Sequence, residues 1–229
     1  MLAALIFIGW LIAVIGDSVS ICPSSIPSGC NTAAYYLAQN NAVVVILHQY
    51  YQIFTSILVT GSQLDEGALD AGFNAIAVLI LDRLTEDVLD KPKYFLVFFL
   101  TAILGNLLTL LEGPDYVSAG ASGGIFGIFA AIISFSWARE KRVDAPTLTL
   151  FLVIFFGSSI LPHVNWVAHV GGALGGFIMG NVLYQMAKPR ISDYSASNDS
   201  SFAAKLGTAG LISLLTITSI IQFVLFARG

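Results

Sequence analysis

Charged side chains are scarce in this chain of 229 residues, of which Asp, Glu, Lys and Arg together make up only 10%. Soluble proteins carry about 25% charged residues, because their surface must stay hydrated. Ten Lys and Arg residues against fourteen Asp and Glu residues give a net charge of −4. The chain therefore lacks the basic face that a nucleic-acid-binding protein needs. Two cysteines are also too few for a disulfide scaffold.

Hydrophobic residues dominate the composition instead, at 56% of the chain and a mean hydropathy of +0.83. A helix needs roughly 20 residues to cross a hydrocarbon core of about 30 Å. Backbone groups in lipid must be paired within the segment, which favours helices. We expect seven spans, near residues 2–21, 68–84, 94–111, 120–138, 148–161, 167–187 and 206–226. The predicted fold is an all-α, polytopic bundle of seven transmembrane helices, with the first run read as a retained span because it lacks the features of a signal peptide.

The positions of the cations predict the orientation of the bundle. Nine of the ten Lys and Arg residues lie in loops 83–93, 139–145 and 188–205, and cytoplasmic loops are rich in these residues. The N-terminus is therefore expected in the cytoplasm and the C-terminus outside. Residues 42–60 are apolar enough to suggest a further span, but a crossing there would move nine cations outside. We expect this stretch to lie in the outer leaflet as an amphipathic or re-entrant segment.

Two glycine-rich runs carry the candidate catalytic side chains. The run SAGASGGIF places Ser122 between Gly120 and Gly123, and the run NWVAHVGGALGG contains His169 and Gly172. An ionisable side chain inside a span is costly and suggests a function. A structural histidine bonded to a neighbouring helix is the alternative.

Distances along the two helices place these side chains at one depth. Ser122 lies 17 residues before Arg139, and His169 lies 19 residues before Lys188. At 1.5 Å per residue these intervals are about 25 and 28 Å. Glycines repeat every four residues in both runs, and small residues at that spacing let helices approach closely in lipid. Unless the glycines serve packing alone, the hydroxyl and the imidazole are expected to meet, and a base is what a serine nucleophile requires.

The rest of the predicted site is less strongly marked. The carboxylates within or beside the spans are Asp17, Asp70 and Asp82. None shares a motif with His169, so a two-residue dyad is predicted. Phe126 follows Ser122 by one helical turn and is placed to hold the imidazole. An oxyanion needs donors, for which the backbone N–H of Ser122 and the amide of Asn74 are candidates. For the amide of Asn106, interhelical hydrogen bonding is favoured.

Together, these runs resemble the rhomboid family of intramembrane serine proteases. GASG ending at Gly123 resembles the nucleophile motif, AHVGGALGG beginning at Ala168 resembles the His-bearing sixth helix, and QIFTSILVTGS beginning at Gln52 resembles the stretch before the second helix. The resemblance implies a six-helix catalytic core over residues 1–188. A cytoplasmic linker over 189–205 and an additional C-terminal transmembrane helix over 206–229 would follow it.

The resemblance also implies a function, which is cleavage of transmembrane-helix substrates near the outer membrane face. Ser122 would be the nucleophile, His169 the base and Asn74 an oxyanion donor, with Phe126 in place of the usual tyrosine. The protein would be a multi-pass protein of the cell membrane, partnered by the lipid bilayer and by transmembrane substrates. Its active site would open outward, and no metal or cofactor is expected.

The sequence departs from the family pattern in two respects. Asp70 stands where the family often has a histidine, and the first loop has Tyr51 and Gln52 where a Trp-Arg pair is common. An anion beside the oxyanion site would repel developing negative charge. Cys22 and Cys30 are both expected outside, where either a disulfide or two free thiols are compatible with the sequence. A catalytically inactive relative that binds transmembrane segments, or a small transporter, are the alternative functions.

Overall fold

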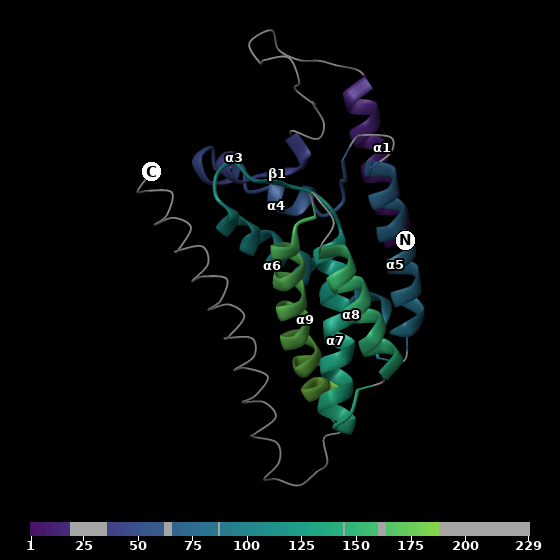
Figure 1. Cartoon of the computed structure of the whole chain (residues 1–229). Helices are drawn as coiled ribbons and strands as arrows, with labels where there is room; N and C mark the ends of the chain where they lie inside the picture. The colour runs from purple at the N-terminus through teal and green to yellow at the C-terminus, as the bar shows by residue number, and fades with distance from the viewer. Residues whose placement is uncertain (19–35, 62–65, 87, 144, 160–163, 188–229) are drawn as a thin grey trace.

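The computed structural model describes residues 1–18, 36–61, 66–86, 88–143, 145–159 and 164–187. Six long helices lie in this part of the chain: α1 (Leu2–Ser18), α5 (Glu66–Leu84), α6 (Lys91–Thr109), α7 (Ser122–Glu140), α8 (Ala145–Ser159) and α9 (Trp166–Ala187) (Figure 1). They coincide with the first six predicted spans. The linker and the seventh span predicted over 189–229, and both cysteines, lie outside the described residues.

The long helices differ in how well they suit a bilayer. Within the described ranges, three helical stretches are long and apolar enough to cross one: Lys91–Glu112, Ser122–Glu140 and Trp166–Ala187. The apolar parts of α1 and α8, Leu2–Gly16 and Ala145–Ser158, are shorter. Helix α5 has 19 residues but contains four charged ones. The all-α class is thus confirmed, while the total of seven spans stays a prediction.

Short elements fill the connection between α1 and α5. Here β1 (Gln39–Asn40), α3 (Asn41–Ile46) and α4 (Gln52–Thr55) lie together at one end of the bundle (Figure 1). β1 pairs antiparallel with β2 (Val117–Ser118), just before α7. Helices of six and four residues are far too short to cross a bilayer. The expectation that residues 42–60 do not form a spanning helix is therefore confirmed.

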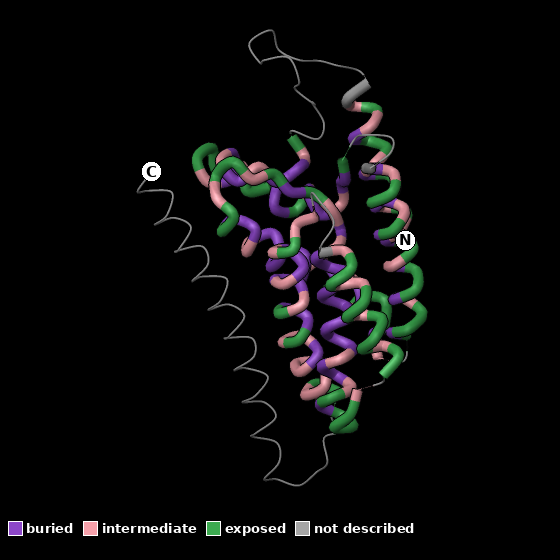
Figure 2. Tube along the Cα trace, viewed as in Figure 1, coloured by how far each residue is buried: buried purple, intermediate pink, exposed green. Residues whose placement is uncertain are grey.

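Helices α6, α7 and α9 form the centre of the molecule, with α7 buried along most of its length (Figure 2). Helices α5 and α8 expose large apolar side chains on their outer faces, among them Phe73, Ile76, Val153 and Phe156. Such a surface is unfavourable in water and suits lipid. Most buried polar side chains in the described part of the chain are hydrogen-bonded, as buried polar groups generally are; one is Asn106, which is 5% exposed.

Helices α7 and α9 run parallel, with their backbones in contact along a row of small residues. On α9 the row is Gly172, Gly176 and Gly180, and these face in order the carbonyl oxygens of Gly123, Gly127 and Ala131 on α7. A methyl group added at any of the three α9 positions would lie 1.9 to 2.1 Å from the facing oxygen. No side chain fits there, so this close approach requires glycine. The predicted packing role of the two glycine repeats is confirmed.

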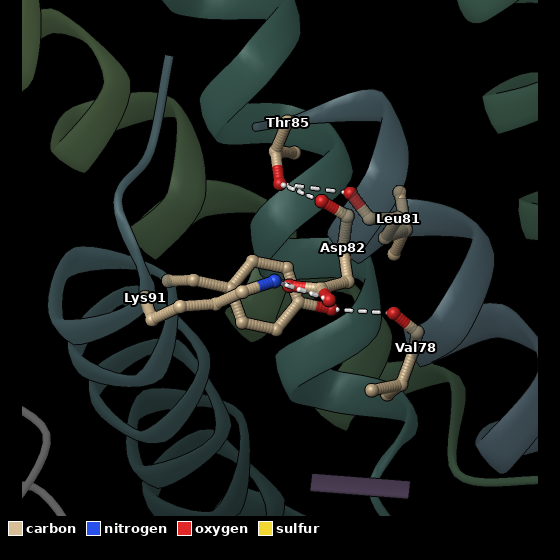
Figure 3. Close-up of polar contacts among 6 residues, drawn as sticks. Val78, Leu81, Asp82, Thr85 and Lys91 are labelled. Atoms are coloured by element: carbon tan, nitrogen blue, oxygen red, sulfur yellow. Dashed lines mark hydrogen bonds and ion pairs between the residues drawn. The ribbon is translucent and has the colours of Figure 1, made fainter. Parts of the chain in front are cut away.

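Hydrogen bonds and an ion pair join the end of α5 to the start of α6 (Figure 3). The Lys91 ammonium lies 2.5 Å from the Asp82 carboxylate, and the Thr85 hydroxyl donates to a carbonyl one turn earlier, 2.8 Å away. Deeper in the bundle, the buried Tyr94 hydroxyl donates to the carbonyl oxygen of Val78 across 2.8 Å. These contacts lie in and beside the predicted cytoplasmic loop 83–93, at the end of the bundle opposite α3 and α4.

Candidate active site

Ser122 is the first residue of α7, where a sharp turn delivers the chain from β2 into the helix. Gly120 makes this turn with a φ of 131°, a conformation that favours glycine. The Gly120 N–H donates to the carbonyl oxygen of Ser56, 2.9 Å away, which ties the turn to the segment holding α3 and α4. Ser122 is half-buried and stands at a helix N-terminus, where backbone N–H groups lack intrahelical acceptors.

His169 lies in the first turn of α9 and is 2% exposed. Its Nε2 atom is 2.9 Å from the Oγ atom of Ser122, a hydrogen-bond distance. The contact follows from the parallel packing of α7 and α9, because Gly123 and Gly172 bring the two N-terminal ends together. The expectation that Ser122 and His169 lie at one depth and meet is thus confirmed as geometry.

Aromatic rings pack beside the imidazole, and no carboxylate of the described residues contacts it. The centroid of the Phe126 ring lies 4.4 Å from that of His169, and the Phe155 ring of α8 lies 6.2 Å away. Within the described part of the chain, Nδ1 of His169 has no hydrogen-bond partner. The contact expected of Phe126 is present, and the pair has no third, acidic member among these residues. Phe155 was not identified from the sequence, since an apolar residue in an apolar run carries no signal.

Asn74 and Asp70 form a pair beside the turn that precedes Ser122. The buried Asn74 amide donates from Nδ2 to Oδ1 of Asp70 across 2.9 Å. The other carboxylate oxygen faces Gly120, where an added methyl group would lie 3.5 Å from it. One amide hydrogen of Asn74 is therefore engaged by Asp70. The pairing was missed in the sequence, although a spacing of four residues on a helix is its signal.

Asn165 was also missed as part of this region. Its Oδ1 atom accepts a hydrogen bond from the backbone N–H of Ala168 at 2.9 Å, which caps α9. Its Nδ2 atom donates to the hydroxyl oxygens of Thr109 and Ser118, at 2.7 Å each. An asparagine directly before an apolar helical run is the signal for the cap, whereas the two distant hydroxyls carry none.

Amide side chains hold the connecting segment, residues 36–61, against α6. Asn106 donates to the Ile53 carbonyl at 2.8 Å and to the Ser56 hydroxyl at 2.9 Å. Ile53 lies in α4 and Ser56 directly follows that helix, so Asn106 joins α6 to α4, which is the interhelical role expected of it. Buried Gln52 accepts from the backbone N–H of Asn40 at 3.0 Å, while Tyr51 is exposed. The chain has no Lys or Arg between residues 22 and 66, so neutral amides fix this segment.

Comparison with known proteins identifies the family of this chain. The family model of the Rhomboid domain matches residues 47–186, from the connecting segment to the end of α9. The chain belongs to the rhomboid family. It is accordingly an integral, multi-pass membrane protein, and its apolar outer surface faces lipid.

Curated rhomboid relatives resemble the chain at moderate identity. The Bacillus subtilis protein named "Putative rhomboid protease YdcA" is 31% identical over 140 residues, covering 58% of this chain and 69% of that protein. RHOMBOID-like protein 1 of Arabidopsis thaliana is 28% identical over 163 residues, which cover 69% of this chain and 40% of that protein. Rhomboid protease GluP of B. subtilis is 26% identical over 130 residues, which cover 55% of this chain and 25% of that protein. The chain thus spans less than two thirds of the latter two relatives.

Proposed function

We propose that this rhomboid is an intramembrane serine endopeptidase in which Ser122 is the nucleophile and His169 the general base. The observation that carries the proposal is the distance of 2.9 Å between Ser122 Oγ and His169 Nε2. A serine hydroxyl is a weak nucleophile until an adjacent base takes its proton. Two of the relatives are named as proteases, which supports the same reading.

Acylation uses both members of the dyad. His169 Nε2 accepts the hydroxyl proton while Ser122 Oγ bonds to the carbonyl carbon of the scissile peptide. The carbonyl electron pair moves onto oxygen and gives a tetrahedral oxyanion. Its collapse re-forms the carbonyl and breaks the C–N bond. The departing nitrogen takes the proton from the imidazolium, which leaves an acyl ester on Ser122.

Deacylation repeats these steps with water. His169 takes a proton from the water as its oxygen bonds to the ester carbon, and the proton then returns to Ser122 Oγ as that oxygen leaves. With no carboxylate at Nδ1 among the described residues, orientation of the imidazole depends on packing. The Phe126 ring, at a centroid distance of 4.4 Å, supplies that packing.

The oxyanion would be stabilised at the start of α7. The Ser122 N–H is free of an intrahelical acceptor, and the positive end of the helix dipole favours an anion there. The Asn74 amide uses one hydrogen on Asp70 and keeps another for the oxyanion. Preorganised donors of this kind are worth several kcal/mol in acyl transfer.

Transmembrane helices are the substrates we propose, cut near the outer membrane face. The positive-inside arrangement puts the start of α7, the start of α9 and the connecting segment on the outer side. Water reaches the ester from that side, since none is available in the hydrocarbon core. A peptide bond within a helix must be unwound before attack. Residues with low helix propensity near the cut are therefore expected to raise the cleavage rate.

Labelling with a fluorophosphonate tests for an activated serine. The purified full-length protein in detergent micelles is treated with the reagent, and cleavage of a transmembrane peptide is followed in parallel. We expect wild type to be labelled and to cleave, and Ser122→Ala and His169→Ala to do neither. In a soluble serine protease, loss of the serine nucleophile lowers kcat by about 10⁶-fold.

Ser136→Ala is the matched control, because Ser136 lies on the same helix and is half-buried. This variant should label and cleave as wild type does. Equal cleavage by Ser122→Ala would overturn the dyad. A wild-type protein that binds transmembrane peptides without being labelled or cutting them would overturn the protease proposal and favour the inactive, segment-binding relative.

A further inference from the structure

Asn165 occupies a bridging place between the segments that lead to the two members of the dyad. It directly precedes α9, and its backbone carbonyl accepts from the His169 N–H at 3.3 Å. Its side chain caps the same helix through Ala168. Both hydrogens of its amide are engaged, one by the hydroxyl of Thr109 and one by that of Ser118. The side chain thus uses both its oxygen and its nitrogen.

The two hydroxyls belong to different elements. Thr109 is the last residue of α6, and Ser118 lies in β2, four residues before Ser122. Asn165 in turn lies four residues before His169. These contacts form a closed circuit. From Ser122 the chain leads back to Ser118, whose hydroxyl oxygen accepts from the amide of Asn165. From Asn165 the first turn of α9 leads to His169, whose Nε2 lies 2.9 Å from Ser122 Oγ.

The circuit matters because little else orients the imidazole by hydrogen bonding. Ser122 is its polar contact, and Nδ1 has no partner in the described ranges. The rotation and depth of the first turn of α9 therefore set the direction of Nε2. A shift of about 1 Å in a reacting group can cost about 10²-fold in rate.

We propose that Asn165 is a positioning residue that fixes α9 against the β2–α7 turn and so sets the geometry of the Ser122–His169 pair. The inference rests on the proposed protease function for its kinetic consequence. Its structural part, the orientation of the imidazole, stands independently of turnover.

The chemistry of the acceptors explains why an asparagine is needed. The Thr109 hydroxyl donates its own hydrogen to the Gly105 carbonyl at 3.0 Å, so its oxygen can only accept at Asn165. An aspartate at position 165 would keep the helix cap and could accept from Ser118. It would also place a carboxylate oxygen against the hydroxyl oxygen of Thr109, with no hydrogen available between them. Asn165→Asp is thus nearly isosteric, and it removes the donor function while adding a negative charge. Thr109→Val weakens the same contact with no change of charge.

Steady-state cleavage and imidazole NMR test the proposal on the full chain in micelles. We expect Asn165→Asp to lower kcat by about tenfold or more with KM within about twofold, because substrate contacts are unchanged. Thr109→Val, which removes one of the two acceptors of the Asn165 amide, should also lower kcat, by a smaller factor. In ¹⁵N-histidine-labelled protein, Asn165→Asp should move the His169 Nε2 resonance towards its position in Ser122→Ala.

Asp90→Ala is the matched control. Asp90 caps α6 by accepting from the Lys93 N–H at 3.0 Å, so the variant loses a bond of the same kind away from the dyad. It should leave kcat and the His169 resonance as in wild type. A wild-type kcat and resonance in Asn165→Asp would overturn the proposal, as would equal losses of kcat in both variants.

The two measurements separate this inference from the proposed function. If wild type neither cleaves nor labels, the protease proposal fails. A His169 resonance that still responds to Asn165→Asp and not to Asp90→Ala would uphold the positioning role, and an unresponsive one would refute it.

Discussion

Replacing Gly176 by alanine is the sharpest test of the close contact between α7 and α9. The added methyl group would lie 1.9 Å from the carbonyl oxygen of Gly127 and 2.7 Å from its carbonyl carbon. Ordinary contact begins at 3.4 Å, so the helices must separate locally by about 1.5 Å. The obstacle is backbone on a buried helix, which cannot rotate away as a side chain could.

The size of the effect follows from that separation. Overpacking of a well-packed interior costs about 1–3 kcal/mol, and a gap of 0.5–1 Å already forfeits about a quarter to a half of the dispersion energy of facing atoms. If the displacement carries through to the helix ends, the distance of 2.9 Å between Ser122 and His169 rises towards about 4.4 Å, beyond a hydrogen bond. We therefore expect loss of stability and of fluorophosphonate labelling together.

Thermal unfolding in micelles and the labelling rate provide the assay. At about 2–4 °C per kcal/mol for a chain of this size, Gly176→Ala should lower the Tm by about 2–12 °C. Gly157→Ala on α8 is the control, because a methyl group there meets nothing within 4 Å. It should be as stable as wild type or more stable by up to about 1 kcal/mol, because alanine favours the helix over glycine. If the two variants unfold and label alike, the reasoning from close packing is refuted.

Four further substitutions at three positions test separate contacts. Tyr94→Phe removes a buried hydrogen bond to α5 and should lower stability by about 1 kcal/mol in thermal unfolding, while the labelling rate stays unchanged. Asp70→Asn removes a carboxylate beside the proposed oxyanion site and should raise kcat by at least about fivefold, because about 1 kcal/mol is the repulsion of two charges about 4 Å apart in bulk water and screening within the bundle is weaker; a fall in kcat would show instead that Asn74 needs the carboxylate. Phe126→Ala should lower kcat about two- to tenfold, the value of an aromatic contact, whereas Phe126→Tyr should keep the wild-type rate because a ring still packs on His169.

Much of the fold was accessible from the sequence because lipid imposes simple rules. The apolar runs located six described helices to within a few residues, and cation placement ruled out a spanning helix over residues 42–60. Counting residues from Arg139 and Lys188 put Ser122 and His169 at one depth. The structure then brings them to 2.9 Å. These inferences need only helical rise and the position of charges.

Side-chain hydrogen bonds between distant segments were not accessible in this way. The bridge from Asn165 to Thr109 and Ser118 joins residues 47 and 56 positions apart, and no periodicity marks either end. The pairing of β1 with β2 involves two residues in each strand, too few for an alternating pattern. Asn106 was placed correctly as a buried amide, yet its partners in the connecting segment depend on how that segment folds back over α6.

The hydrogen bond from Gly120 to Ser56 makes the turn before Ser122 sensitive to bilayer thickness. The segment that accepts this bond exposes Ile46, Leu47 and Phe54, and apolar side chains of an interfacial segment favour a fixed depth in the bilayer. Hydrophobic mismatch costs only fractions of a kcal/mol per ångström, but here that force acts on a segment bonded two residues from Ser122. We therefore expect lipids of different acyl length to change the force on the Gly120–Ser56 hydrogen bond as well as the tilt of the surrounding helices.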